Sequence, residues 1–343
     1  MIEDLYMYEL KGKTILLFAP SFFGYDKAIK CSLEEEGALV HLYDERPNPS
    51  TIEKIIIRKI PRILHSKIER YYYSINDAEK EGEIDYIFFV NSEAVNKESL
   101  LMLKKTHPNA KMILYMWDSA KNKHIKNYFG LFDKILSFDK GDCEKYGLIF
   151  RPLFYLQGFE KVNNGISQDD YEYDLSFVGT AHSDRARILL KILEECKEKE
   201  LKLFLYIYIP GKIMYFLRML TDSSLRKIDK GLIHIVPIPK EEYIEISRKT
   251  RCVVDIEHPK QTGLTMRTIE MLGACKKLMT TNVEVKGYDF YKPSNQIWFD
   301  RDAICIDEEM IRKPYQHVDD DIYYKYSIKG WIKDIFGEGG GVS

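Results

Sequence analysis

The apolar residues of this chain gather in short runs that are separated by longer, amphipathic stretches. The first run, Thr14–Ala19, has the length and composition of a strand buried on both faces. Between such runs lie stretches, for example 27–36 and 52–72, in which apolar residues recur with helical spacing. Alternating strands and helices predict an α/β domain with one doubly wound parallel sheet. Its further strands are predicted at Leu39–Tyr43, Ile84–Val90, Lys111–Met116, Lys134–Ser137 and Leu148–Leu153.

The alternation stops at a polar segment and then starts again. Lys161–Tyr173 has the composition of an interdomain linker. The expected fold class is therefore α/β, with two Rossmann-like doubly wound domains, residues 1–160 and 174–320, that face one another. An aromatic stretch within 321–336 predicts a C-terminal helix that returns to the first domain. Strands of the second domain are predicted at Leu175–Gly179, Leu201–Ile209, Leu232–Val236 and Cys252–Ile256, and helices at Ser183–Lys199 and Lys240–Lys249.

Composition narrows the class of protein. A chain of 343 residues with 45% hydrophobic content can bury a large core, and its net charge of −2 argues against a general nucleic-acid binder. Six scattered cysteines without a C-x-x-C pair favour a reduced compartment and no zinc site. With an acidic N-terminus and no run of 18 apolar residues, a cytoplasmic location is expected. The acidic run Asp319–Asp321 is typical of a solvated turn, and neither a metal nor a cofactor is predicted.

The segment Asp255–Asn282 is the most informative one for function. A buried strand leads through Gly263 and Leu264 into a helix that Thr265 can cap. The first backbone N–H groups of a helix attract anions, and Arg267 adds a forked donor beside them, so a diphosphate is the predicted guest. Glu270, about 7.5 Å further along the helix, could accept the hydroxyls of a ribose. The alternative is an amphipathic core helix with a surface Arg–Glu pair, and this segment alone does not decide between them.

A second turn supports the prediction of a diphosphate site. The strand that ends at Gly179 and Thr180 is followed by His182 and by Arg185 at the start of a helix. Glycine allows a phosphate to approach the backbone, and the two basic side chains can donate to it. His258, in the loop before the Thr265 helix, is a further candidate to contact the hydroxyls or the phosphate of such a ligand. Taken alone, this turn would be an ordinary connection between a strand and a helix.

These residues carry a resemblance to a known family. The two-domain plan, the turn FVGTAHSDR (177–185) and the segment GLTMRTIEMLGACKKLMTTN (263–282) resemble the GT-B fold glycosyltransferases. The similarity is greatest to bacterial enzymes of capsular and lipopolysaccharide synthesis and to the related spore-maturation protein group. It implies that the second domain holds a nucleotide-sugar donor, most simply a UDP-sugar, and that the first domain receives a glycan or lipid-linked acceptor. The reaction would occur in the cleft between them. It also places Gly179, Thr180 and Arg185 near the donor phosphates, Thr265 and Arg267 at the diphosphate, and Glu270 at the ribose.

The resemblance leaves the mechanism open at one position. Many retaining members carry a glutamate eight residues before the ribose-binding one, where this chain has Thr262, and inversion is therefore favoured. Inversion needs a general base, for which Asp118, directly after a buried strand, is the first candidate. Asp118 could instead cap the helix that follows it. Asp26, Glu93 and Asp139 are rivals at equivalent turns. The predicted acceptor contacts are Phe22, Phe23, Gly24, Tyr25 and Trp117.

Two stretches rich in both basic and apolar residues, Ile52–Tyr73 and Gly211–Lys230, suggest peripheral contact with an anionic membrane. The alternative is a pair of core helices with solvated charged faces. The function predicted is a metal-independent glycosyltransferase of surface polysaccharide synthesis. Another enzyme of the same fold, such as a sugar-nucleotide epimerase or a polyol-phosphate transferase, and a non-catalytic nucleotide-binding module are the alternatives.

Overall fold

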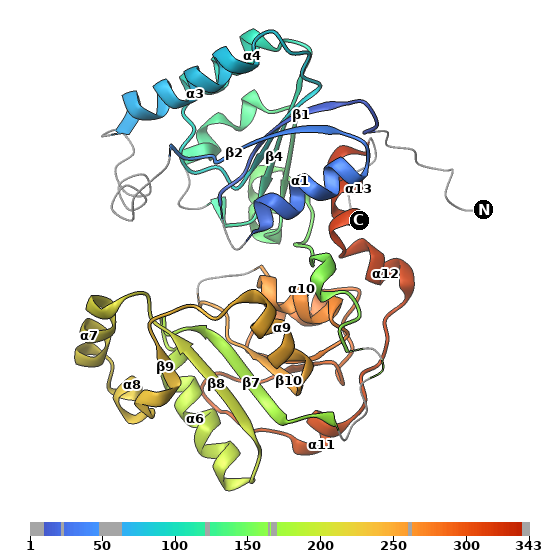
Figure 1. Ribbon diagram of the computed structural model, residues 1–343. Helices are drawn as coiled ribbons and strands as arrows, with labels where there is room; N and C mark the ends of the chain where they lie inside the picture. The colour runs from blue at the N-terminus through green and yellow to red at the C-terminus, as the bar shows by residue number, and fades with distance from the viewer. Residues whose placement is uncertain are drawn as a thin grey trace. The chain divides into compact units, whose positions relative to one another are not determined.

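The computed structural model describes residues 10–21, 24–47, 64–120, 124–163, 165, 170–259 and 263–337. The chain forms two compact units, Met1–Leu153 with Ile328–Ser343 (unit 1) and Phe154–Ser327 (unit 2). Each unit contains one six-stranded sheet whose paired strands are all parallel, flanked by helices (Figure 1). The predicted fold class of two α/β units is confirmed.

The sheet of unit 1 has the strand order β2-β1-β3-β4-β5-β6. Its first five strands lie where the apolar runs predict them, because such runs fit a strand that is buried on both faces. The chain moves outward from β1 in both directions, so β1 and β3 form the switch point of this sheet. The strands are β1 (Thr14–Phe18), β2 (Leu39–Tyr43), β3 (Tyr86–Val90), β4 (Lys111–Met116), β5 (Lys134–Ser137) and β6 (Ile149–Phe150). Its described α-helices are α1 (Tyr25–Glu35), α3 (His65–Glu79), α4 (Lys97–Thr106), α5 (Lys140–Tyr146) and α13 (Ile328–Phe336).

The C-terminal helix α13 completes unit 1, as predicted. Its Trp331 is fully buried, with ring centroids 5.8 Å from Phe88 and 4.9 Å from Tyr115. Lys134 Nζ donates to three carbonyls at the end of the helix, those of residues 334, 335 and 337, at 2.9 to 3.0 Å. The stretch 321–336, predicted as a C-terminal helix, is not one helix, however. Helix α12 (Asp320–Lys325) ends before Ser327, which forms an isolated β-bridge with Tyr155, and α13 begins only at Ile328.

The sheet of unit 2 has the order β12-β11-β10-β7-β8-β9. From β7 the chain builds outward to β8 and β9, and from β10 it builds outward on the other side to β11 and β12. The switch point of this sheet therefore lies between β7 and β10. The strands are β7 (Tyr173–Thr180), β8 (Leu203–Tyr208), β9 (Ile233–His234), β10 (Thr250–Asp255), β11 (Lys277–Thr280) and β12 (Gln296–Trp298). The main helices are α6 (Arg185–Glu198), α7 (Lys212–Thr221), α8 (Ser223–Lys227), α9 (Lys240–Arg248), α10 (Met266–Gly273) and α11 (Glu308–Arg312).

The predictions for the two stretches rich in basic and apolar residues have different outcomes. Most of Ile52–Tyr73 lies outside the described residues, but Ile68 and Tyr72 on α3 are buried in the core of unit 1. Helix α7, within the second stretch, lies at the surface: none of its residues is buried, although Tyr215 and Met219 pack against the core of unit 2. Within the described part of the chain, no helix is long and apolar enough to cross a membrane.

Candidate functional site

The two segments singled out by sequence meet at the switch point of unit 2. Gly179 and Thr180 end β7, and Asp255 ends the neighbouring strand β10. Ligands of doubly wound sheets bind outside the carboxyl ends of the strands at such a point. A Cβ atom added to Gly179 would lie 2.9 Å from Cζ of Phe177 and 3.6 Å from Nη1 of Arg267. The absence of a side chain at Gly179 thus makes room for the ring of Phe177, over which Arg267 lies.

Two arginines connect the two strands of the switch point by hydrogen bonds that run in both directions. Arg185 follows β7, and its Nε donates to the carbonyl of Ile256, just after β10, at 2.7 Å. Arg267 follows β10, and its Nη2 donates to the carbonyl of Val178 in β7. Each arginine thus connects the segment after its own strand to the neighbouring strand. We call this pair of contacts the crossed arginines.

The crossed arginines bring two positive charges together at the switch point, balanced in part by the carboxylates of Asp255, Glu257 and Asp184. Burial, and after it the charge of Arg267, lower the pKa of Arg185 to about 10. Arg267 lies 3.8 Å from the buried carboxylate of Asp255, over the ring of Phe177, and donates through Nε to Tyr243 at 3.2 Å. Two fixed, partly desolvated guanidinium groups so close together attract an anion. Arg267 is therefore a structural clamp as well as a candidate phosphate ligand.

The start of α10 has the capped geometry that the sequence predicts. Oγ1 of Thr265 accepts from the backbone N–H of Thr268 at 3.2 Å and donates to Asp255 at 2.8 Å. The hydroxyl of Thr268 donates to the same carboxylate oxygen at 3.2 Å. The carbonyl of Gly263 accepts from the side chain of Asn282 at 3.2 Å, and Leu264 is buried. The positive end of α10 is thus held rigidly beside the crossed arginines.

Of Glu270 and Thr262, only Glu270 is described by the structure. The charge of Glu270, on α10, acts on both Tyr243 and Arg267, which places its carboxylate on the same side of unit 2. Thr262 lies outside the described residues, so the structure does not test the prediction based on it.

His182 and His258 face each other from the two strands of the switch point. Their ring centroids are 5.7 Å apart. Burial, and after it the charges of Arg185 and His258, together lower the pKa of His182 to about 4. At neutral pH His182 is therefore an uncharged imidazole, with Nδ1 2.9 Å from the hydroxyl of Ser183. A neutral imidazole can donate to a phosphate oxygen without adding a third positive charge.

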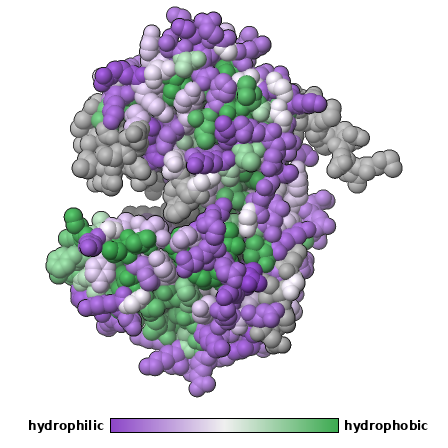
Figure 2. Space-filling view, in the orientation of Figure 1, coloured by the Kyte–Doolittle hydropathy of each residue, from purple (hydrophilic) through white to green (hydrophobic). Residues whose placement is uncertain are grey.

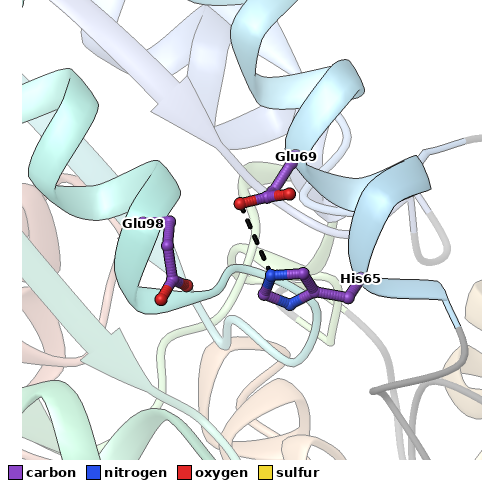
Figure 3. Close-up of side chains that lie close together, drawn as sticks. All are labelled: His65, Glu69 and Glu98. Atoms are coloured by element: carbon purple, nitrogen blue, oxygen red, sulfur yellow. Dashed lines mark ion pairs between the residues drawn. The ribbon is translucent and has the colours of Figure 1, made fainter.

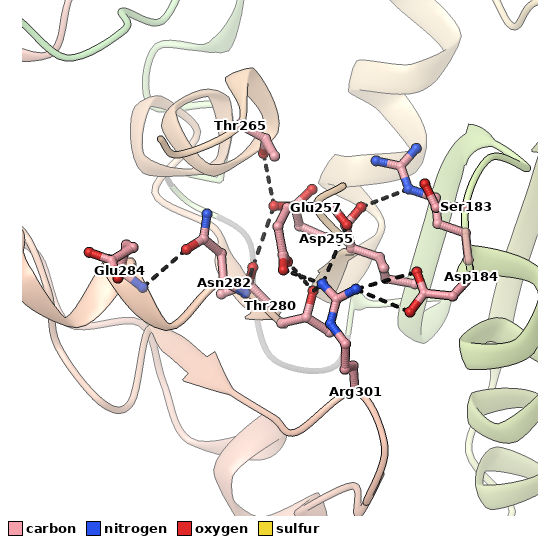
Figure 4. Close-up of polar contacts among 12 residues, drawn as sticks. Ser183, Asp184, Asp255, Glu257, Thr265, Thr280, Asn282, Glu284 and Arg301 are labelled. Carbon is pink, nitrogen blue, oxygen red and sulfur yellow. Dashed lines mark hydrogen bonds and ion pairs between the residues drawn. The ribbon is translucent and has the colours of Figure 1, made fainter. Parts of the chain in front are cut away.

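Sequence reasoning missed a charged network behind this turn (Figure 4). Nη1 of Arg301 donates to both carboxylate oxygens of Asp184, at 3.3 and 3.1 Å. Nη2 of Arg301 donates to Glu257, whose second carboxylate oxygen accepts from Thr281. The position of Glu257 just after β10 could have indicated that it is part of a site. Arg301 is 44 residues further along the chain, and no local pattern in the sequence marks it. The network fixes the start of α6 against the segment that follows β10.

The described candidates for acceptor binding and for the base lie at the carboxyl edge of the sheet in unit 1. Asp118 follows β4, is exposed, and accepts from Nδ2 of Asn91 at 3.1 Å. The rings of Tyr25 and Trp117 meet edge to face at 6.1 Å. Asp26 is buried in the first turn of α1, after Gly24 with its φ of 76°. Phe22 and Phe23 lie outside the described residues.

Of the weaker rivals for the base, Asp139 has a structural role. It is buried and accepts from the backbone N–H of Asp142 as the N-cap of α5. The backbone N–H groups of Glu93 and Ala94 both donate, at 2.9 Å, to Glu45, a fully buried carboxylate that the sequence did not single out. Burial raises the pKa of Glu45 to about 7. Asp118 is thus the most accessible of the carboxylates considered at this edge.

One cluster of metal-ligand type occurs among the described residues, on α3 and α4 (Figure 3). The candidate ligand atoms of His65, Glu69 and Glu98 lie within 4.8 Å of one another. Oδ1 of Asn96 accepts from the N–H of Ser99, so its Nδ2 faces Nδ1 of His65 at 3.2 Å. The ring proton therefore belongs on Nε2, 3.4 Å from Glu69. A hydrogen-bonded surface pair accounts for this geometry without a metal ion.

Comparison with known proteins identifies the fold. No family model matches the chain, and no curated protein matches it by sequence. Among solved structures, the lipopolysaccharide outer core galactosyltransferase WaaB is similar, with 10% identity and a TM-score of 0.52 over 94% of this chain and 98% of that one. Anabaena Alr3699/HepE, in complex with UDP and glucose, has 9% identity and a TM-score of 0.55 over 94% and 98%. A putative UDP-N-acetylglucosamine 2-epimerase from Listeria monocytogenes has 11% identity and a TM-score of 0.53 over 95% of each chain. The predicted GT-B fold is thereby confirmed.

The charge state of His182 tests the electrostatics of this site. We expect its ring resonances to titrate near pH 4 in the free protein, because burial and nearby cations disfavour the charged form. Since its pKa falls on folding, the stability that this shift provides is present above about pH 6.5 and is lost as the pH falls towards 4. Inorganic diphosphate should raise the pKa of His182.

The measurement is an NMR titration of histidine C–H resonances, with His182→Gln for assignment. The resonances of His317, an exposed histidine of the same unit, should not shift when diphosphate is added. A His182 resonance that titrates near pH 6.5 and does not respond to diphosphate would contradict the assigned electrostatics.

Proposed function

We propose that the protein is a glycosyltransferase that moves a sugar from a nucleotide sugar, most simply a UDP-sugar, to a glycan or lipid-linked acceptor in surface polysaccharide synthesis. The observation that carries this proposal is the pair of crossed arginines at the switch point of unit 2. Beside it lie the start of a helix and a glycine, which together provide donors and space for a diphosphate. HepE, a structure of similar fold, binds UDP and glucose, which supports this choice of ligand.

In the proposed donor complex the diphosphate lies between Gly179 and the first turn of α10. Arg185, Arg267 and His182 donate to its oxygens, and the helix dipole adds a further positive contribution. The ribose hydroxyls donate to Glu270, about 7.5 Å from Thr265 along the helix. His258 contacts the sugar or its phosphate. The site thus uses fixed protein charges to hold a ligand with a charge of about −2.

The proposed reaction is a displacement at the anomeric carbon with inversion, as favoured by Thr262 at the position of the first retaining glutamate. Asp118 removes the proton of the acceptor hydroxyl while that oxygen forms a bond to the anomeric carbon. The bond from this carbon to the phosphate oxygen breaks, and its electron pair leaves with the nucleoside diphosphate. Arg185, Arg267 and the helix dipole stabilise the charge that develops there, so the proposed step does not require a metal ion.

A second candidate function is a sugar-nucleotide epimerase. It is favoured by the similarity to the Listeria protein, which matches over as much of the chain as the transferases do. An epimerase would use the same donor site but would return an isomerised sugar without an acceptor. Product analysis after incubation with a panel of UDP-, GDP-, CDP- and TDP-sugars distinguishes the two: a new glycosidic bond supports transfer, and an isomerised sugar supports epimerisation.

Donor recognition predicts a specific effect at Glu270. Replacement of Glu270 by Ala removes a charged acceptor for the ribose hydroxyls, and such hydrogen bonds contribute about 1.5–3 kcal/mol. We therefore expect UDP to bind roughly 10- to 100-fold more weakly by calorimetry. The matched control is Glu194→Ala, which removes an exposed carboxylate from α6. Equal UDP affinity in the Glu270 variant and the wild type would show that the ribose position is wrong.

The proposed base predicts an effect on turnover alone. Asp118→Asn keeps the shape of the side chain but cannot take a proton, so we expect the transfer rate to fall by about 10²- to 10⁴-fold. The dissociation constant of the donor should stay unchanged. The control is Asp77→Asn, an exposed residue of α3 in the same unit. Transfer at the wild-type rate by Asp118→Asn would rule out this assignment.

A further inference from the structure

The helix α7 exposes an apolar stripe to solvent. Its members follow the spacing i, i+3, i+4 and i+7 of a single helix face. The opposite side of the helix carries Tyr215 and Met219, which pack against the core of unit 2. The helix is thus attached through one apolar side and presents a second one outward. The stripe consists of Ile213, Phe216, Leu217 and Leu220, which are 81%, 63%, 49% and 60% exposed.

The apolar surface extends beyond the helix. Ile235 and Val236, just after β9, are also exposed, as is Met214. In Figure 1, α7 stands at one end of unit 2 beside β9, and Figure 2 shows apolar atoms gathered there with polar atoms around them. We call these seven residues the α7 patch. A contiguous exposed apolar patch of this kind marks an interaction surface, because water contact with it is unfavourable.

The charge around the α7 patch is opposite in sign to that of the chain. Residues 211–236 contain five Lys or Arg and two Asp, a net charge of +3, whereas the whole chain has −2. Both aspartates are engaged in helix capping: Asp222 accepts from the N–H groups of Ser224 and Leu225, and Asp229 accepts from that of Gly231. In the segment that carries the α7 patch, two acidic residues are thus outnumbered by five basic ones. The basic residues are Lys212, Arg218, Arg226, Lys227 and Lys230.

These features fit a lipid surface better than a second copy of the chain. A stable interface between two proteins takes about 20–30 residues from each side, and the α7 patch offers seven. A symmetric partner would also bring the basic residues of both copies together. An amphipathic helix bordered by Lys and Arg matches the boundary between acyl chains and anionic headgroups, which accepts apolar side chains and attracts cations at once.

We infer that the α7 patch docks this protein on an anionic lipid bilayer, with Ile213, Phe216 and Leu220 inserted among the acyl chains. The docked helix follows the carboxyl end of β8, the strand next to β7, and so begins at the same edge of the sheet as the candidate diphosphate site. Burial has the largest effect on the pKa of His182, but the charge of Arg218 on α7 also acts on it. If the proposed function holds, this arrangement brings the donor site close to the membrane and favours a lipid-linked acceptor. Docking itself does not depend on the proposed activity.

The inference predicts binding of the full-length protein to vesicles. We expect it to co-sediment with vesicles that contain about 30% phosphatidylglycerol. It should bind phosphatidylcholine vesicles at least tenfold more weakly, because each basic residue near an anionic surface strengthens binding about fivefold. Phe216→Ser with Leu220→Ser should reduce binding to the anionic vesicles at least tenfold. Lys227→Glu with Lys230→Glu should do the same at low salt and less at high salt.

The matched control is Leu39→Ser with Leu101→Ser, two exposed leucines of unit 1. Its binding should equal that of the wild type, and the melting temperatures of all variants are compared to exclude unfolding. Three outcomes would overturn the inference: no binding by the wild type, undiminished binding by the Phe216/Leu220 variant, or equal binding to neutral vesicles. A wild-type dimer that this variant dissociates, without vesicle binding, would assign the patch to a second copy instead. Because no sugar transfer is measured, failure here is distinct from failure of the proposed function.

Discussion

The geometry of the candidate site depends on the crossed arginines at the switch point of unit 2. Strands β7 and β10 are neighbours, but from them the chain continues to opposite sides of the sheet. Their carboxyl ends therefore need a connection by side chains. Arg185 and Arg267 supply it through hydrogen bonds to the carbonyls of Ile256 and Val178. Hydrogen bonds to charged groups contribute about 1.5–3 kcal/mol each, which offsets part of the repulsion between the two cations. The guanidinium N–H groups at this edge can also donate to an anionic ligand, so stability and recognition are coupled here.

Carboxylates around the arginines give the site its rigidity. Asp255 holds the hydroxyls of Thr265 and Thr268 and thereby fixes the first turn of α10. Arg301 holds Asp184 at the start of α6. The backbone donors at both turns are therefore in place before a ligand arrives, which lowers the entropy lost on binding. Preorganised donors of this kind also stabilise a leaving diphosphate more effectively than mobile ones.

Local patterns predict the elements of this fold better than its long-range contacts. The buried strands of both sheets were predictable because each is an uninterrupted apolar run, and the cap at Thr265 because its neighbours define it. The edge strand β12 has only three residues, too few for a recognisable pattern. The partners of Arg185 and Arg267 lie 71 and 89 positions away, and no local spacing indicates them. For α7, periodicity revealed an apolar face but not that this face meets solvent.

The central claim is that the carboxyl edge of β7 and β10 binds the diphosphate of a nucleotide. Hydrogen–deuterium exchange of the full-length protein with and without saturating UDP tests it most directly, because it reports backbone N–H groups at each turn separately. The account predicts slower exchange in peptides that cover residues 179–185 and 264–268. Unchanged exchange in both segments, while UDP demonstrably binds, would contradict the account.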